Sequence, residues 1–135
     1  MQIADLHSEL LAGQQLLEEG RNEAGISRME NALHFYRQIE AAPERIEYQP
    51  SKDIPISLRI IALNWDMAVA LCLLADAYLV TNRRMQAIQS LTEAVERFEK
   101  AEAHAGFETK VELRELATTA RQRLEEVDWM SQHQE

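Results

Sequence analysis

The side chains in this sequence best able to do chemistry are one cysteine and four histidines, and their spacing gives catalysis little support. Cys72 is the only cysteine, so this sequence offers neither an internal disulfide nor a cysteine-rich zinc site. Its neighbours Leu71, Leu73 and Leu74 are apolar. Apolar surroundings raise the pKa of a thiol, so we expect Cys72 to be a poor nucleophile.

The histidines lack the partners that a metal site needs. Helical di-iron sites use a Glu followed three residues later by a His, and none of His7, His34, His104 and His133 has a Glu at that place. Glu30 and His34 lie one helical turn apart, which is also the spacing of an ordinary surface pair. No glycine-rich phosphate loop follows a strand pattern. We therefore expect no enzyme, no metal and no cofactor.

Composition indicates an all-helical soluble domain. The chain has 135 residues, 46% of them hydrophobic, with only four Gly and three Pro. Ala, Leu, Glu, Gln and Arg dominate, and these are strong helix formers. The formal net charge of −9 disfavours nucleic acid and acidic membranes as partners, because both attract clustered Lys and Arg. Such a charge suits a soluble protein or one that recognises a basic partner.

Cellular location can be predicted from three further features. No basic stretch followed by an apolar core stands near the N-terminus, so no signal peptide is expected. The longest charge-free apolar run, Met67 to Ala75, is much shorter than the roughly 18 residues of a membrane span. A lone cysteine is typical of a reducing compartment. We therefore expect a cytoplasmic protein that does not contact a membrane.

Periodicity and stop signals predict five helices. Gly20 and Gly106 are suited to end helices, Asn82 tolerates the left-handed conformation, and Asp53 with Pro55 just inside is a start signal. The expected helices cover about 3–19, 22–41, 53–81, 85–104 and 108–129, with an irregular loop at 44–52 and a frayed tail at 130–135.

Two phrases of small and large residues recur in the same order, 62 positions apart (13 to 75). The first phrase is Gly13, Leu16, Gly20, Gly25, Ile26, Met29, Ala32 and Leu33. The second is Ala75, Tyr78, Asn82, Ala87, Ile88, Leu91, Ala94 and Val95. A glycine inside a helix costs about 1 kcal/mol relative to alanine. Gly13 and Gly25 are therefore expected where two helices approach closely, with Ala75 and Ala87 at the matching crossing.

With Leu71 and Leu74 added, the second phrase resembles the tetratricopeptide repeat, a helical hairpin with small and aliphatic residues at fixed places. The first phrase matches it too, except that Glu9 stands where a large apolar residue is usual. Leu113, Leu116, Ala117 and Ala120 repeat the pattern of the first helix 42 positions after Leu71 (71 to 113). The resemblance implies an all-α fold: TPR-like hairpins in a right-handed superhelix with a C-terminal capping helix.

The resemblance also implies how the chain is divided. One domain would cover 1–135, with repeat-like units at 6–41 and 68–105, an insertion with an extended helix at 42–67, and a capping helix at 108–129. The spacing of 62 exceeds the usual repeat, and the insertion could lengthen the third helix, fill the groove or mediate self-association. A plain antiparallel helical bundle is the alternative fold.

In this family partners lie in a concave groove lined by the first helix of each hairpin. The corresponding residues are His7, Leu10, Gln14, Leu17, Val69, Cys72, Asp76, Leu79, Arg114, Thr118 and Arg121. An apolar floor with Asp76 on one side and two arginines on the other could hold an extended or helical peptide. The lysine–asparagine clamp of some relatives is missing. The alternative is that Val69, Cys72 and Leu79 belong to the core.

The expected function is a protein-binding adaptor or regulator, with another protein or peptide as its partner. The rival is a structural homodimer in which Ile54, Ile56, Ile60 and Ile61 make the contact. Three further sets of residues are candidates for the core or for contact with a partner. Trp65 is expected in the core, Trp129 anchors a partner or packs on the fourth helix, and Arg83–Arg84 is solvent-exposed or contacts an acidic partner.

Overall fold

The computed structural model describes residues 3–41 and 56–133, and it describes side chains over 8–41 and 58–133. The described residues form five helices and no strand, which confirms the predicted all-α class. The helices are α1 (Ile3–Glu18), α2 (Asn22–Ala41), α3 (Ile56–Val80), α4 (Arg84–His104) and α5 (Phe107–Gln132). The expected loop at 44–52 and the helix start at Asp53 lie outside the described residues.

The helix ends agree with the expected ones except at the C-terminus. Residues 130–132 continue α5 in place of the predicted frayed tail. At the end of α5 the backbone N–H of His133 donates to the carbonyl of Trp129 at 3.0 Å, so the last turn is closed. The side chain of Trp129 therefore sits on an ordered helix.

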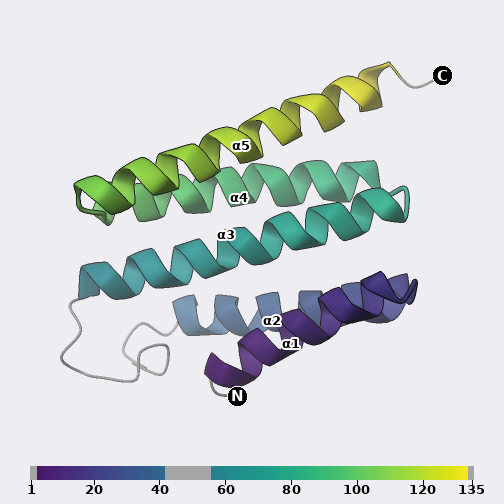
Figure 1. The fold of residues 1–135 in the computed structure, drawn as a ribbon, viewed down its shortest axis with the longest axis horizontal. Helices are drawn as coiled ribbons and strands as arrows, with labels where there is room; N and C mark the ends of the chain where they lie inside the picture. The colour runs from purple at the N-terminus through teal and green to yellow at the C-terminus, as the bar shows by residue number, and fades with distance from the viewer. Residues whose placement is uncertain (1–2, 42–55, 134–135) are drawn as a thin grey trace.

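The helices lie side by side in two layers. Each helix packs mainly against its neighbours in the chain, and α1 also touches α3. Figure 1 shows α1, α3 and α5 toward the viewer, with α2 and α4 behind them. We call the side toward the viewer the front face and the opposite side the back face. One continuous core lies between the layers, with Met29, Tyr36, Met67 and Leu91 fully buried in it.

Close approach of α1 and α2 at their glycines, predicted from the sequence, is confirmed. A Cβ atom added to Gly25 would lie 2.7 Å from the carbonyl oxygen of Gly13 and 2.8 Å from Cγ of Leu17. A Cβ atom on Gly13 would lie 2.6 Å from Cγ of Met29. Real Cβ atoms do not come so near, so only glycine permits this packing. The matching residues of the second hairpin, Ala75 and Ala87, are both fully buried.

Both hairpins turn with the same hydrogen bonds, 62 positions apart. In each turn the residue with positive φ bonds back three residues and the next residue bonds back five, which is the Schellman arrangement. The donor–acceptor pairs are Gly20 N–Leu17 O, Arg21 N–Leu16 O, Asn82 N–Leu79 O and Arg83 N–Tyr78 O. Gly20 has φ 81° and Asn82 has φ 61°. The repeat seen in the sequence is therefore a repeat of backbone geometry.

We predict that Gly20→Ala destabilises the protein by about 1 kcal/mol, because an L side chain is strained at positive φ. Gly106→Ala is a matched control: a Cβ at either glycine would meet nothing within 4 Å, but φ at Gly106 is −74°. Gly106 is the N-cap of α5, where glycine is preferred to alanine, but alanine also lowers the entropy of the unfolded chain. Because these effects oppose each other, the control should change the free energy of unfolding by less than about 0.5 kcal/mol. Urea unfolding measures both, and equal shifts would contradict the assignment of strain to Gly20.

Helix α3 is unusually apolar on all sides. By length and composition its segment Leu58–Val80 is long and apolar enough to cross a membrane, which the shorter run 67–75 did not indicate. The core helix of a soluble protein passes the same test, and 44% of the apolar window is buried here. Burial in the core explains one side of α3. The other side requires a separate explanation.

Candidate protein-interaction surface

The least buried side of α3 carries one continuous stripe from Leu58 to Val80. Its members follow one another at intervals of three or four residues, so they share one helix face. They are Leu58, Ala62, Trp65, Val69, Cys72, Asp76 and Val80, which we call the α3 stripe. Leu58 is 52% exposed, Val69 40% and Val80 71%. Six of the seven are apolar, so the stripe is the pattern of a helix that packs against another helix.

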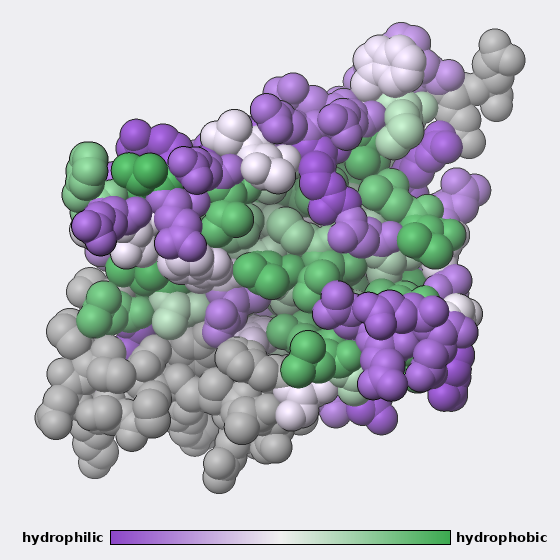
Figure 2. Space-filling view, in the orientation of Figure 1, coloured by the Kyte–Doolittle hydropathy of each residue, from purple (hydrophilic) through white to green (hydrophobic). Residues whose placement is uncertain are grey.

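The α3 stripe lies on the front face, between α1 and α5. Figure 2 shows apolar side chains in a band across the middle of this face. More hydrophilic side chains lie over α5 above the band and at the lower right, where α1 meets α2. An apolar surface bordered by polar ones is the usual composition of a protein-interaction site.

Asp76, the one charged member of the stripe, pairs with α5. Its carboxylate accepts a hydrogen bond from the guanidinium of Arg123. Arg123 was not among the residues predicted from the sequence. The pair joins α3 to α5 across the front face, and it neutralises the only charge in the stripe.

The two arginines predicted to face Asp76 lie elsewhere. Arg114 donates to Glu102 at 2.9 Å, and Arg121 lies 3.1 Å from Glu99, so both pair with α4. Arg114 and Arg123 are nine positions apart, which places them about half a turn from each other around α5. Thr118 is exposed and donates to the Arg114 carbonyl. The rotation of α5 relative to α3 that was predicted from the sequence is therefore wrong.

The remaining predicted groove residues are on the front helices with varied exposure. Leu10, Leu17, Cys72 and Leu79 are half-buried and pack against the core. Gln14 is also half-buried, whereas the side chain of His7 lies outside the described residues. The exposure of Val69 excludes the alternative that it belongs to the core. Leu11, one position after Leu10, is 66% exposed and had not been predicted to take part.

Cys72 gives a chemical probe of this face. Burial raises the pKa of the Cys72 thiol, and the nearby Arg123 charge offsets this only in part. A raised pKa means less thiolate at neutral pH, so we predict slower alkylation by iodoacetamide than for a free cysteine. The rate should rise as pH passes the ordinary thiol range. Arg123→Gln should slow the reaction further, and a rate that matches free cysteine would contradict this placement.

Of the four residues proposed for self-association, the structure describes the side chains of two, and neither of these is exposed. Ile61 is buried in the core, and Ile60 is half-buried on the same helix. Ile54 and the side chain of Ile56 lie outside the described residues. Substitution of Ile61 would therefore disturb the core rather than a contact between copies.

The two tryptophans differ in their surroundings. Trp65 is half-buried, packs against the core and belongs to the α3 stripe. Trp129 is 60% exposed, and its ring stacks on that of His133 with centroids 4.2 Å apart. In the basic pair Arg83–Arg84, Arg83 forms an ion pair with Glu23 of α2.

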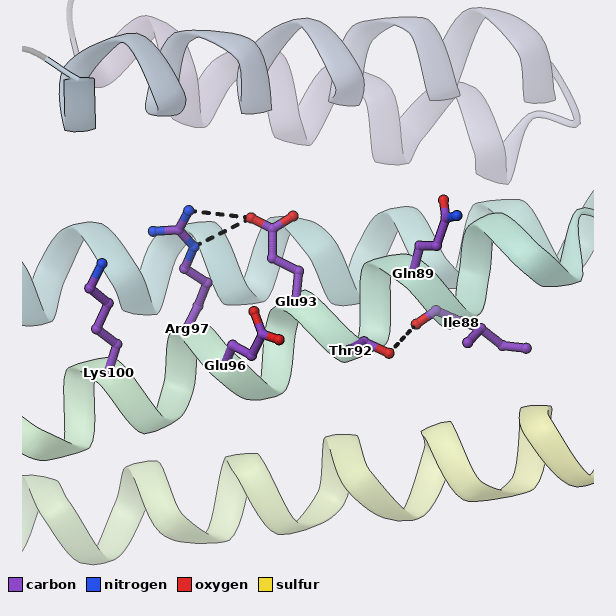
Figure 3. Close-up of a pocket in the computed structure, with 7 residues that line it drawn as sticks. All are labelled: Ile88, Gln89, Thr92, Glu93, Glu96, Arg97 and Lys100. Atoms are coloured by element: carbon purple, nitrogen blue, oxygen red, sulfur yellow. Dashed lines mark hydrogen bonds and ion pairs between the residues drawn. The ribbon is translucent and has the colours of Figure 1, made fainter.

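The back face carries a shallow cavity of about 510 Å³ along α4 (Figure 3). Its lining residues are Ile88, Gln89, Thr92, Glu93, Glu96, Arg97 and Lys100. Glu93 receives two hydrogen bonds from Arg37 of α2, at 2.7 and 2.6 Å. Arg97 pairs with Glu40 of α2 and lies 3.3 Å from Glu93. These charges bind one another, so the cavity marks where the two hairpins are joined.

Potential metal ligands are not gathered in the part of the chain that the structure describes. There, no group of three or more His, Cys, Asp and Glu side chains could hold a metal ion. Glu30 and His34 engage different neighbours: the Tyr78 hydroxyl donates to Glu30 at 2.6 Å, and His34 lies 3.2 Å from the Gln38 amide.

Comparison of the chain with family models, with curated proteins and with solved structures finds no match in any of the three.

Proposed function

We propose that this chain is a non-enzymatic interaction module that binds a helical segment of another protein along the α3 stripe. TPR-like stacking of its hairpins and a cytoplasmic location belong to the same proposal. The observation that carries it is the stripe, in which apolar residues follow at three- and four-residue intervals along α3. Leu58, Val69 and Val80 are exposed there, and none of the described helices lies over them. Apolar residues at that spacing form the contact surface when two helices pack against each other.

The apolar contacts would supply the affinity. Burying a Val or Leu side chain completely contributes about 1.5–3 kcal/mol. Leu58, Val69 and Val80 are each between two-fifths and three-quarters exposed, so each has about 1 kcal/mol left to gain. The two flanking helices limit how a partner can lie. A helix seated on the stripe would contact α1 on one side and α5 on the other.

We predict that Val69→Asp abolishes partner capture from cells that make the protein. A charge at the centre of the stripe would be buried without a partner in the complex. Thr92→Asp is the matched control, because Thr92 is exposed on the back face of α4. The measurement is affinity capture with mass spectrometry on both variants and the wild type, after circular dichroism has verified folding. Identical captured proteins for all three would refute the proposed site.

The molecular mass in solution distinguishes partner binding from the rival function, self-assembly through α3. The wild type should sediment as a monomer at micromolar concentration. A stable dimer that dissociates on Val69→Asp would favour self-assembly over partner binding.

A further inference from the structure

The proposed partner site is bordered by carboxylates on both flanks, and this charge indicates what kind of helix the site accepts. We infer that the occupant is a basic amphipathic helix, with an apolar stripe that packs on α3 and Lys or Arg residues on its flanks. This inference rests on the proposed function and specifies its partner.

The charges of α5 are segregated around the helix. Arg114 and Arg121 pair with α4, on the side of α5 away from the stripe. Glu112 and Glu126 are respectively eleven residues before and three residues after Arg123, so both share the side of α5 that reaches α3. Both are exposed, and neither has an ion pair with a described basic side chain. Two carboxylates thus border the stripe on the α5 side.

The α1 side is bordered by acid as well. Glu18 occupies the place in the first hairpin that Val80 occupies in the second, 62 positions later. It is exposed, and no described basic side chain pairs with it. Arg123, the basic residue that reaches the stripe from α5, is already bound to Asp76. Acidic borders with a neutral apolar floor favour a cationic occupant.

The acidic borders disfavour the other candidate occupants. Two copies of this chain, each with a formal net charge of −9, would bring the same carboxylates together around a shared stripe. An anionic lipid surface would be repelled by the same groups. The stripe runs from Leu58 to Val80, which corresponds to about 33 Å of helix at 1.5 Å per residue. A basic helix of about 20 residues would cover it.

The test uses three synthetic peptides of 22 residues and the full chain. The first peptide has Leu at three- and four-residue intervals flanked by Lys, the second replaces the Lys with Glu, and the third scrambles the Lys peptide so that its apolar face is lost. Fluorescence anisotropy measures binding. The Lys peptide should bind at least about tenfold more tightly than the other two, and added salt should weaken it because the bordering charges are exposed.

Two matched triple variants locate the effect on the protein. Glu18→Gln with Glu112→Gln and Glu126→Gln removes the borders of the stripe and should weaken the Lys peptide about fivefold, the effect of three exposed ion pairs. Glu96→Gln with Glu125→Gln and Asp128→Asn removes the same total charge away from the front face. This control should change binding by less than about twofold, because screened charges at a distance contribute little.

The outcomes separate this inference from the proposed function. Equal binding of the Lys and Glu peptides, both lost on Val69→Asp, would overturn the basic occupant and leave helix docking standing. Equal binding of the scrambled peptide, or equal weakening by the two triple variants, would also overturn it. Failure of both amphipathic peptides to bind would contradict both proposals. Binding of the chain to vesicles rich in phosphatidylserine, with none to the Lys peptide, would identify a lipid surface instead.

Discussion

Gly25→Val should lower the free energy of unfolding by about 3 kcal/mol, the upper part of the range for overpacked cores. The new side chain would need the space taken by the Gly13 carbonyl and by Leu17, 2.7 and 2.8 Å from a Cβ at this position. A backbone carbonyl inside a helix cannot move aside as a flexible side chain does. The substitution must therefore push α1 away from α2 and expose part of the first hairpin's interface.

Gly25→Ala should cost less, about 1–2 kcal/mol, because alanine regains about 1 kcal/mol of helix propensity. Ser27→Val is the control, since Ser27 is exposed on the same helix and receives the same β-branched residue. Its effect should stay within about 0.5 kcal/mol. Chemical unfolding followed by circular dichroism measures all three. A Gly25→Val protein as stable as the control would show that the two helices do not meet at their glycines.

Arg97→Met should destabilise the protein by about 2–3 kcal/mol, because the guanidinium joins three helices in a partly buried place. Its side chain is only 13% exposed, and it donates to Glu40 of α2 at 3.0 Å and to Asn64 of α3 at 3.1 Å. Methionine keeps much of the volume but loses every donor. The Asn64 oxygen, in a fully buried side chain, would lose this donor.

Arg121→Met is the control for Arg97→Met, because the Arg121–Glu99 pair is largely exposed and should contribute less than about 1 kcal/mol. Equal effects of the two substitutions would mean that the Arg97 cluster does not join the hairpins.

Low pH should weaken the same junction between the hairpins. Arg37 lowers the pKa of Glu93, so this stabilisation is complete above the ordinary carboxyl pKa and is lost as pH falls through the lowered value.

Features that depend on local backbone chemistry could be predicted from the sequence. Gly20 and Asn82 were expected to end their helices, and both adopt positive φ in identical turns. Gly13 and Gly25 were expected at a close approach, because a glycine inside a helix needs a compensating contact. In both cases the type of residue alone restricts the backbone conformation or the contacts in which it is stable.

Features that depend on the rotation of one helix against another could not be predicted from the sequence. The small residues Ala117 and Ala120 correctly identify the buried side of α5. They do not specify which flank lies next to α3. Arg114 and Arg121 were therefore expected to line the groove opposite Asp76, whereas the structure has Arg123 there. A weak signal existed: Arg123 follows the buried Ala120 by three residues and the half-buried Leu116 by seven. Arg123 therefore lies on the flank of α5 that borders the core.

The resemblance placed Val69, Cys72 and Asp76 on the open side of α3, but the polarity pattern of the residues alone could not identify that side. An alternating pattern distinguishes buried from exposed faces only when the two differ in polarity. The stripe is as apolar as the buried side, so the sequence could not say which residues were covered. The pairing of Arg97 with Glu40 joins positions 57 residues apart in the chain, and no local pattern encodes it.

The claim that a partner helix seats on the front face can be tested by one NMR measurement. A Lys-flanked amphipathic helix with a nitroxide at its centre is bound to the methyl-labelled full chain, and the loss of methyl signal is recorded. The account predicts strong loss at Leu58, Val69 and Val80, with Ile88 and Thr92 on the far side of α4 nearly unaffected. Strong loss at Ile88 and Thr92 with Val69 unchanged would contradict it, because the helix would then lie against the junction of the two hairpins.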